Sequence, residues 1–271
     1  MRALVLEGGG MRSAFTSGVL DAWMDYDVRY DYVIGTSAGA TEGISYVARQ
    51  KGRSRFSNTD LLRINDYIGL RPMLFGGGAI DIHYLFDVYP DKYYPFDFET
   101  YRRTPERCIV VATNALTGEA VYLEEKNNFP RFLEACRASC SLPIVCPMGM
   151  VDGMPMVDGG VSDSVPFQKA IDDGADQIDI VLTKPRGYRK KGRGINLPWF
   201  IYRKYPNLRR ALAMRNELYN AQMERLEQLE DEGRVSVLRP QSDFGVGRMT
   251  KDVDKLEQLY DHGYSLGVNF L

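Results

Sequence analysis

A serine placed between two glycines, directly after a short apolar run, constrains the fold of this chain most. Residues 32–34 (Tyr-Val-Ile) lead into 35–39 (Gly-Thr-Ser-Ala-Gly), which fits the pattern G-x-S-x-G, and small and apolar residues follow. A strand, a glycine-flanked serine and a helix form a nucleophile elbow, a strained turn that holds the serine hydroxyl beyond the strand end. Strand and helix almost touch there, and Gly35 and Gly39 leave the space. The alternative is a glycine-rich turn in which Ser37 caps the helix.

A glycine triplet near the N-terminus predicts an anion-binding loop. Residues 3–6 predict a buried strand, 8–10 are all glycine, and apolar residues at helical spacing predict a helix over about 12–25. Such a loop leaves backbone N–H groups unpaired at the positive end of a helix. Neither a dinucleotide nor a nucleoside triphosphate pattern is present, since position 13 is serine and Gly-Lys-Ser/Thr is absent from the sequence. Parallel strands open on one sheet edge, so we expect the triplet to lie beside Ser37 as an oxyanion hole.

Strands alternate with helices along the rest of the chain. This alternation predicts a three-layer α/β/α fold with a mostly parallel central sheet, formed by one domain over residues 1–271. The apolar patterns predict strands at 108–113, 120–123, 178–183 and 234–239, a hairpin over 148–157, and helices at about 129–138, 166–173 and 208–230, with a final helix capped by Thr250.

The composition argues against several classes of protein. A net charge of −2 and a pI near 5.8 disfavour a general nucleic-acid binder. The apolar run after Arg2 is too short for a signal peptide, and no stretch approaches the about 20 apolar residues of a membrane-spanning helix, so we expect a cytoplasmic protein. The cysteines show no C-x-x-C spacing and no nearby histidine, so we expect reduced, buried thiols and no metal site; they are Cys108, Cys136, Cys140 and Cys146.

Two further segments have an unusual composition. Residues 66–107 are dense in aromatics around a second glycine triplet, 76–78, and either line or cover an acyl-chain channel or form the core of a cap. Residues 184–216 contain eleven basic residues and no acidic one, around Trp199-Phe-Ile-Tyr202. This basic segment predicts either peripheral contact with an anionic membrane or a solvated loop whose aromatics pack into the fold.

A serine nucleophile needs a base, and histidine is the usual one. The chain has two histidines, His83 and His262. The order Ser37, Asp158, His262 is that of α/β-hydrolase triads, although His262 falls within a predicted helix. Asp158 begins an Asp-Gly-Gly sequence that a tight turn would also explain. The residues alone leave the identity of the base open.

Three motifs together resemble the patatin-like phospholipase family. They are Gly8-Gly-Gly-Met-Arg12, Gly35-Thr-Ser-Ala-Gly39 and Asp158-Gly-Gly160, and Ala138-Ser139 with Pro143 is similar to the segment that precedes the aspartate in the family. The similarity covers roughly residues 3–48 and 136–172. One departure is Ser13, where the family loop usually continues with glycine, and it affects the detail of the loop.

This resemblance implies a serine acyl hydrolase of the phospholipase A or lysophospholipase type that cleaves lipid esters without a metal or organic cofactor. It implies a dyad in which Ser37 is the nucleophile and Asp158 accepts its proton, with much of the catalysis left to the oxyanion hole. The implied loop donors are Gly8, Gly9, Gly10, Met11 and Arg12, and the supporting glycines are Gly35, Gly39, Gly159 and Gly160. The alternatives are a triad esterase that uses His262, and a non-catalytic lipid- or acyl-binding protein.

Overall fold

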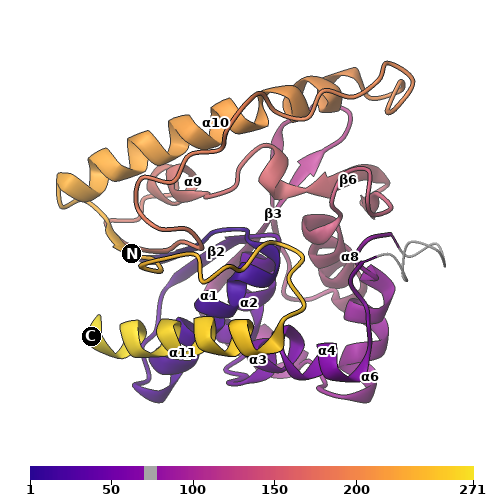
Figure 1. The fold of residues 1–271 in the computed structure, drawn as a ribbon. Coiled ribbons are helices and arrows are strands. Elements are labelled where there is room, and N and C mark those ends of the chain that lie inside the picture. The colour runs from indigo at the N-terminus through magenta and orange to yellow at the C-terminus, as the bar shows by residue number, and fades with distance from the viewer. Residues whose placement is uncertain (70–77) are drawn as a thin grey trace.

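A mostly parallel sheet is the centre of the computed structural model, which describes residues 1–69 and 78–271 (Figure 1). The strand order is β5-β6-β3-β2-β1-β7-β8, with β4 paired to β3 off this path. The five strands from β3 to β8 in this order run parallel. β4 and β6 each pair antiparallel with β3, and β5 pairs antiparallel with β6. The strands are β1 Arg2–Leu6, β2 Tyr32–Thr36, β3 Arg107–Asn114, β4 Ala120–Glu124, β5 Gly149–Val151, β6 Met154–Asp158, β7 Gln177–Val181 and β8 Ser236–Leu238.

Helices cover both faces of the sheet, and this produces the expected three layers (Figure 1). On β1, Leu4 and Leu6 point into one apolar core while Ala3 and Val5 point into the other, as alternation along a doubly covered strand requires. The first core packs against α1 Ala14–Asp25, α2 Ala38–Val47, α8 Phe129–Cys140 and α11 Val253–Asn269. The second packs against α9 Phe167–Asp172 and α10 Pro206–Asp231.

Short helices fill the connections. The cap region between β2 and β3 contains α3 Arg53–Asn58, α4 Asp60–Ile64, η2 Tyr84–Val88, α6 Tyr89–Lys92 and α7 Phe98–Arg103. The single-turn helices η1 Gly10–Ser13 and η3 Gly159–Val161 follow β1 and β6. Positions 75–77 of the aromatic segment, including two glycines of its triplet, lie outside the described residues. No helix in the ranges 1–69 and 78–271 combines the length and apolar character needed to cross a membrane.

The strand register brings two chain segments together that are far apart in sequence. β2 runs parallel to β3 and ends with Thr36 opposite Val111, whereas β6 runs antiparallel and ends with Asp158 opposite Ala112. Because β4 occupies the other side of β3 over 109–113, β2 and β6 share one side and meet end to end. The last residues of β2 and β6 therefore pair with adjacent residues of β3, which brings the ends of these two strands together.

One predicted helix cap is wrong. Asp252, not Thr250, caps α11, and its carboxylate accepts from the Lys255 N–H at 3.3 Å. The Thr250 hydroxyl instead accepts from the Gly247 N–H at 2.8 Å and closes the preceding turn. A carboxylate at this position also complements the helix dipole, which a hydroxyl does not.

Candidate active site

Ser37 occupies the turn between β2 and α2 in a strained conformation, with φ 55° and ψ −124°. The flanking glycines permit this turn, because a Cβ on Gly35 would lie 2.4 Å from the Gly39 carbonyl oxygen. A Cβ on Gly39 would lie 2.6 Å from the Leu6 carbonyl oxygen. Positive φ at a non-glycine residue costs about 1–3 kcal/mol and persists only where the surroundings enforce it. The geometry is that of a nucleophile elbow.

Ser139 on α8 holds the elbow in place. Its hydroxyl accepts from the Ser37 N–H at 2.8 Å and donates to the Val111 carbonyl oxygen at 2.6 Å. The turn is thereby tied to both α8 and β3. In the sequence, Ala138-Ser139 stood out only through the family resemblance. No local pattern predicts that Ser139 holds the elbow.

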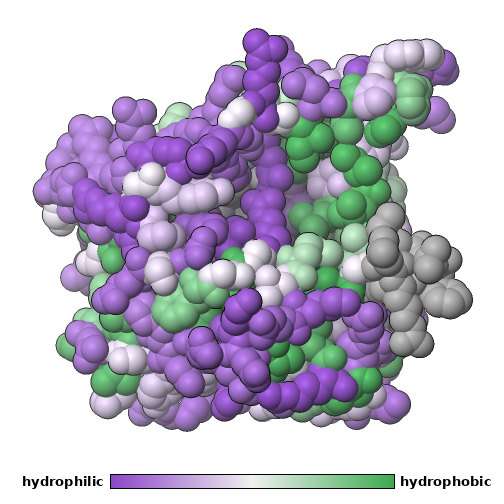
Figure 2. Space-filling view, in the orientation of Figure 1, coloured by the Kyte–Doolittle hydropathy of each residue, from purple (hydrophilic) through white to green (hydrophobic). Residues whose placement is uncertain are grey.

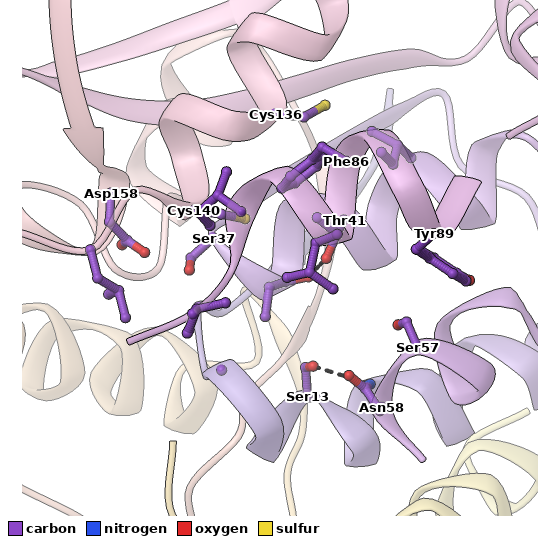
Figure 3. Close-up of a pocket in the computed structure, with 18 of the residues that line it drawn as sticks. Ser13, Ser37, Thr41, Ser57, Asn58, Phe86, Tyr89, Cys136, Cys140 and Asp158 are labelled. Atoms are coloured by element: carbon purple, nitrogen blue, oxygen red, sulfur yellow. Dashed lines mark hydrogen bonds between the residues drawn. The ribbon is translucent and has the colours of Figure 1, made fainter. Parts of the chain in front are cut away.

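Asp158 is 2% exposed and stands at the end of β6. One carboxylate oxygen, Oδ1, accepts from the Gly160 N–H at 2.7 Å. The other, Oδ2, is buried and has no hydrogen-bond partner among the residues the structure describes. Figure 3 shows the carboxylate and the Ser37 hydroxyl directed toward the same space. This arrangement leaves one carboxylate oxygen available to accept a proton from the serine.

The glycine triplet lies against the elbow, and a Cβ on Gly8 would be 3.3 Å from the Ser37 Cβ. Two of the backbone donors expected there are already engaged. The Gly8 N–H donates to the Ser164 carbonyl at 3.2 Å, and the Met11 N–H donates to the Arg248 carbonyl at 3.1 Å. Within the described part of the chain, the N–H groups of Gly9 and Gly10 have no backbone acceptor outside their own helix. These two are the loop's candidate oxyanion donors.

A third candidate donor was not foreseen from the sequence. Ala38 is the first residue of α2 and lines the same cavity as Ser37. Its N–H belongs to the first helical turn and has no acceptor within the helix. The residue after an elbow nucleophile supplies an oxyanion donor in α/β-hydrolases, and the G-x-S-x-G pattern could have indicated this.

Arg12 is buried and its Nε lies 3.5 Å from the Thr183 hydroxyl. Burial lowers the pKa of this guanidinium, and the nearby carboxylate of Glu7 opposes that effect. Arg12 therefore braces the loop against the end of β7 and adds positive charge beside it. It is not among the described residues that line the cavity around Ser37.

A cavity of about 350 Å³ opens beside Ser37 and Asp158. Its far wall is apolar and combines the cap region with α8, including Ile82, Leu85, Phe86, Tyr89, Phe96 and Phe132. Other aromatics of the cap, such as Tyr101, are buried, and the Tyr101 ring packs at a tilt against Phe132. Some side chains of the aromatic segment therefore line the cavity, and others form the core of the cap.

Neither histidine lies at the site. His262 packs between the rings of Phe15 and Phe244, and its Nε2 accepts from the Gln241 N–H at 3.3 Å. His83 is largely exposed and its Nδ1 lies 2.6 Å from a carboxylate oxygen of Asp87 on the same helical segment. Neither is among the described residues that line the cavity. The structure therefore argues against the triad alternative, because α11 places His262 between Phe15 and Phe244 and not among the described residues that line the cavity.

Cys140, at the end of α8, also lines the cavity near Ser37 (Figure 3). Burial raises the pKa of this thiol well above its usual range, and the neighbouring Asp158 carboxylate raises it further. The thiol is therefore neutral and does not compete with Ser37 as a nucleophile. All four cysteines are free thiols, and Cys108, Cys136 and Cys146 are buried.

Part of the basic segment is neutralised within the fold. Arg186 pairs with Asp231 at 2.5 Å, and Arg189 pairs with Glu227 at 2.6 Å, both across to α10. Other side chains of the segment remain exposed, among them Lys191, Arg193, Trp199, Phe200, Arg203 and Lys204.

Comparisons with known proteins identify related sequences and a related fold. A family model described as patatin-like phospholipase matches residues 4–171, and one described as a domain of unknown function (DUF6363) matches residues 205–271. Uncharacterized protein YjjU of Escherichia coli K12 is 29% identical over 189 residues, 68% of this chain and 52% of YjjU. Patatin-like phospholipase domain-containing protein 6 of mouse and of human is 27% identical over 291 residues, 98% of this chain and 20% of each relative.

The chain thus spans about half the length of YjjU and about a fifth of the mammalian relatives. The crystal structure of VipD from Legionella pneumophila matches with a TM-score of 0.51 and 12% identity, over 99% of this chain and 66% of VipD. That likeness shows the α/β fold. The family model covers more than half of the residues. The chain belongs to the patatin-like phospholipase family, whose members are generally ester hydrolases.

Proposed function

We propose that the protein is a serine acyl hydrolase that cleaves lipid esters, with Ser37 as nucleophile and Asp158 as its base. The observation that carries this proposal is the buried Oδ2 of Asp158, which has no hydrogen-bond partner in the ranges 1–69 and 78–271 and lies where β6 meets the elbow of β2. A buried carboxylate oxygen without a partner is costly to the fold, so a role in proton transfer accounts for its retention.

The reaction follows from these positions. The Ser37 hydroxyl oxygen attacks the ester carbonyl carbon while its proton passes to Asp158, and the carbonyl oxygen becomes an oxyanion. The tetrahedral intermediate collapses to an acyl-Ser37 ester, and the leaving alcohol takes the proton from Asp158. Water then attacks the acyl-enzyme with Asp158 as base, which releases the fatty acid and restores the serine.

A carboxylate is a weaker base than imidazole, so oxyanion stabilisation has to contribute more of the rate. The N–H groups of Gly9, Gly10 and Ala38 are the donors we assign to this task. Loss of a single oxyanion donor costs about 10²–10³ in rate in other hydrolases. The apolar wall of the cavity is suited to the acyl chain, because burial of each methylene contributes about 0.8 kcal/mol.

Covalent labelling with a fluorophosphonate tests the proposal. The wild-type protein should be labelled, and Ser37→Ala should not. Asp158→Asn should be labelled much more slowly, because the serine loses its proton acceptor. Ser57→Ala is a matched control that should leave labelling intact. The Ser57 hydroxyl belongs to the same cavity but donates to the Ser54 carbonyl on its own helix.

The alternative is a non-catalytic lipid-binding protein with the same cavity. It predicts that the wild type retains fatty acid or lipid but is neither labelled nor active on any ester. Labelling of wild type and Ser37→Ala alike would also contradict the proposed nucleophile.

We also propose that the protein contacts an anionic lipid surface through the loop that precedes α10. Trp199 and Phe200 are 64% and 63% exposed, and the exposed cations Arg203 and Lys204 follow after two intervening residues. Figure 2 shows hydrophobic residues gathered on the side of β6 and toward this loop. Each basic residue near an anionic membrane contributes about 1 kcal/mol, and exposed aromatics favour the interface.

Sedimentation with phosphatidylglycerol vesicles tests this contact. Replacing Trp199 and Phe200 with serine should release the protein from the vesicles, whereas replacing the remote, exposed pair Arg102 and Arg103 with glutamine should not. Equal sedimentation of the wild type with phosphatidylcholine and phosphatidylglycerol vesicles would contradict the role of the basic residues.

A further inference from the structure

Two arginines from the C-terminal part of the chain reach the active-site cavity. Arg215 on α10 and Arg248, in the loop before α11, both line the cavity that contains Ser37 and Asp158. Both belong to the 205–271 segment that matches a domain of unknown function. The Nε of Arg215 donates to the Gly160 carbonyl at 2.7 Å, which places its guanidinium beside the Asp-Gly-Gly turn. The catalytic pair is therefore flanked on one side by two fixed cations.

Two more basic side chains, Lys190 and Arg12, lie close to these arginines. Burial, followed by the nearby charges of Arg215 and Arg248, lowers the pKa of Lys190 to about 6. The guanidinium of Arg12 also has a lowered pKa, through burial and then the charge of Arg248. Burial and the charge of Arg248 likewise lower the pKa of Arg215 to about 10. The charge of Arg248 thus lowers the pKa of three neighbouring basic groups, and the four side chains form one cluster.

The carboxylates near this cluster are already engaged. Glu7 accepts from the Tyr219 hydroxyl at 2.9 Å and from the backbone and hydroxyl of Thr183 at 2.6 and 2.9 Å. The Asp158 carboxylate is needed for the reaction. Lys190 Nζ is buried, lies 3.8 Å from the centre of the Tyr219 ring, and has no hydrogen-bond partner among the described residues.

Arg248 is the cation best placed to receive a ligand. Its backbone carbonyl anchors the Met11 N–H, which fixes the residue beside the glycine loop. Its side chain makes no ion pair or side-chain hydrogen bond with any residue in the described ranges. A half-buried arginine that faces a cavity and repels its neighbours is stabilised when an anion enters, and its guanidinium offers paired donors that match a phosphate.

We propose that Arg215 and Arg248, supported by the charge of Arg12, bind a phosphate group of the substrate beside Ser37. The apolar wall of the cavity then holds the acyl chain, and the 205–271 segment selects esters that carry a phosphate close to the scissile bond over neutral acylglycerols. This inference rests on the proposed function, because it assigns a headgroup site to the same reaction.

A pair of substrates that differ only in the phosphate tests the site. A monoacylglycerol 3-phosphate and the monoacylglycerol, each with the same short, soluble acyl chain, are compared on the wild type and on Arg248→Gln. The wild type should prefer the phosphate-bearing ester by at least about tenfold in kcat/KM, as one charge-assisted contact allows. Arg248→Gln should abolish this preference through KM. Arg225→Gln, an exposed arginine of α10, should keep it.

The other outcomes of this comparison are equally decisive. An equal loss of kcat on both substrates would show that Arg248 positions the loop, and would overturn the proposal. Inorganic phosphate should compete with the phosphate-bearing ester in the wild type. If it instead alters hydrolysis of the neutral ester without competing, the site takes a free regulatory anion and not the headgroup.

Binding to Ser37→Ala separates this inference from the proposed function. Inorganic phosphate should raise the thermal midpoint of Ser37→Ala, and the shift should be lost when Arg248→Gln is added. A shift without any ester hydrolysis by the wild type would contradict the hydrolase and the headgroup role built on it. Hydrolysis by the wild type without any phosphate shift or substrate preference would contradict the phosphate site alone.

Discussion

Glu42 provides a prediction whose size follows from the structure. It lies on α2 directly behind the elbow, is 2% exposed, and accepts from the Ser17 hydroxyl at 2.8 Å and the Asn58 side chain at 3.1 Å. Its other carboxylate oxygen is buried without a partner among the described residues. Burial raises the pKa of Glu42 to about 7, and the nearby polar side chains of Ser17, Ser54, Asn58 and Ser13 oppose this effect.

The direction and size of the pH effect of Glu42 on stability follow from proton linkage. The usual pKa of the carboxyl is 4.5, so the folded-state value of about 7 is higher by about 2.5 units. At about 1.36 kcal/mol per unit, this corresponds to about 3 kcal/mol. Between pH 4.5 and 7 the folded protein keeps a proton that the unfolded chain has released. The contribution of Glu42 to the free energy of unfolding is therefore greatest below pH 4.5 and falls by about 3 kcal/mol as the pH rises to 7.

Urea denaturation of the wild type and Glu42→Gln between pH 4.5 and 7.5 measures this contribution. Glutamine stays neutral, so the free energy of unfolding of the wild type relative to the variant should fall by about 3 kcal/mol over this range. Subtracting the variant removes the contributions of the other carboxyls. A difference that is independent of pH would refute the reasoning, because it would mean that the folded protein ionises Glu42 as readily as the unfolded chain.

Three further predictions concern the catalytic elements. Gly39→Ala places a Cβ within 2.6 Å of the Leu6 carbonyl oxygen. The free energy of unfolding, measured by urea denaturation, should therefore fall by about 1–3 kcal/mol. The rate of ester hydrolysis should fall by about 10²-fold. Asp158→Asn should lower kcat by at least about 10³-fold with no loss of thermal midpoint, because it removes a buried charge with an unpartnered oxygen; a coincident loss of stability would indicate a structural role. His262→Gln should retain most ester hydrolysis, and a variant as inactive as Ser37→Ala would restore the triad.

The strained turn at Ser37 was predictable because its signals are local. The glycines that flank Ser37 are required by backbone contacts of a few ångströms, and such contacts leave a fixed spacing in the sequence. The three layers were predictable for a similar reason, since β1 faces two cores and is apolar on both sides. Asp158 could be matched to a family motif, but its position opposite the elbow depends on the register of β6 on β3, which no local pattern encodes.

The cationic side of the cavity could not be predicted in this way. Arg215 lay within the basic segment, where the absence of acidic residues predicted a membrane contact or a solvated loop. The fold turns it inward, because α10 packs on the sheet and directs this residue to the Gly160 carbonyl. Arg248 is far from every motif in the sequence, and it reaches the glycine loop through backbone contacts, among them the hydrogen bond from the Met11 N–H to its carbonyl. Long-range contacts of single side chains carry no periodic signal.

The acyl-enzyme itself provides the most direct test of the central claim. Wild-type protein is mixed with a short-chain nitrophenyl ester, quenched in acid during turnover, digested and analysed by mass spectrometry. The proposed reaction predicts the acyl mass on the peptide that contains Ser37, and no acyl adduct in Ser37→Ala. Sustained turnover with the acyl group on another residue, or with equal rates in the wild type and Ser37→Ala, would contradict it.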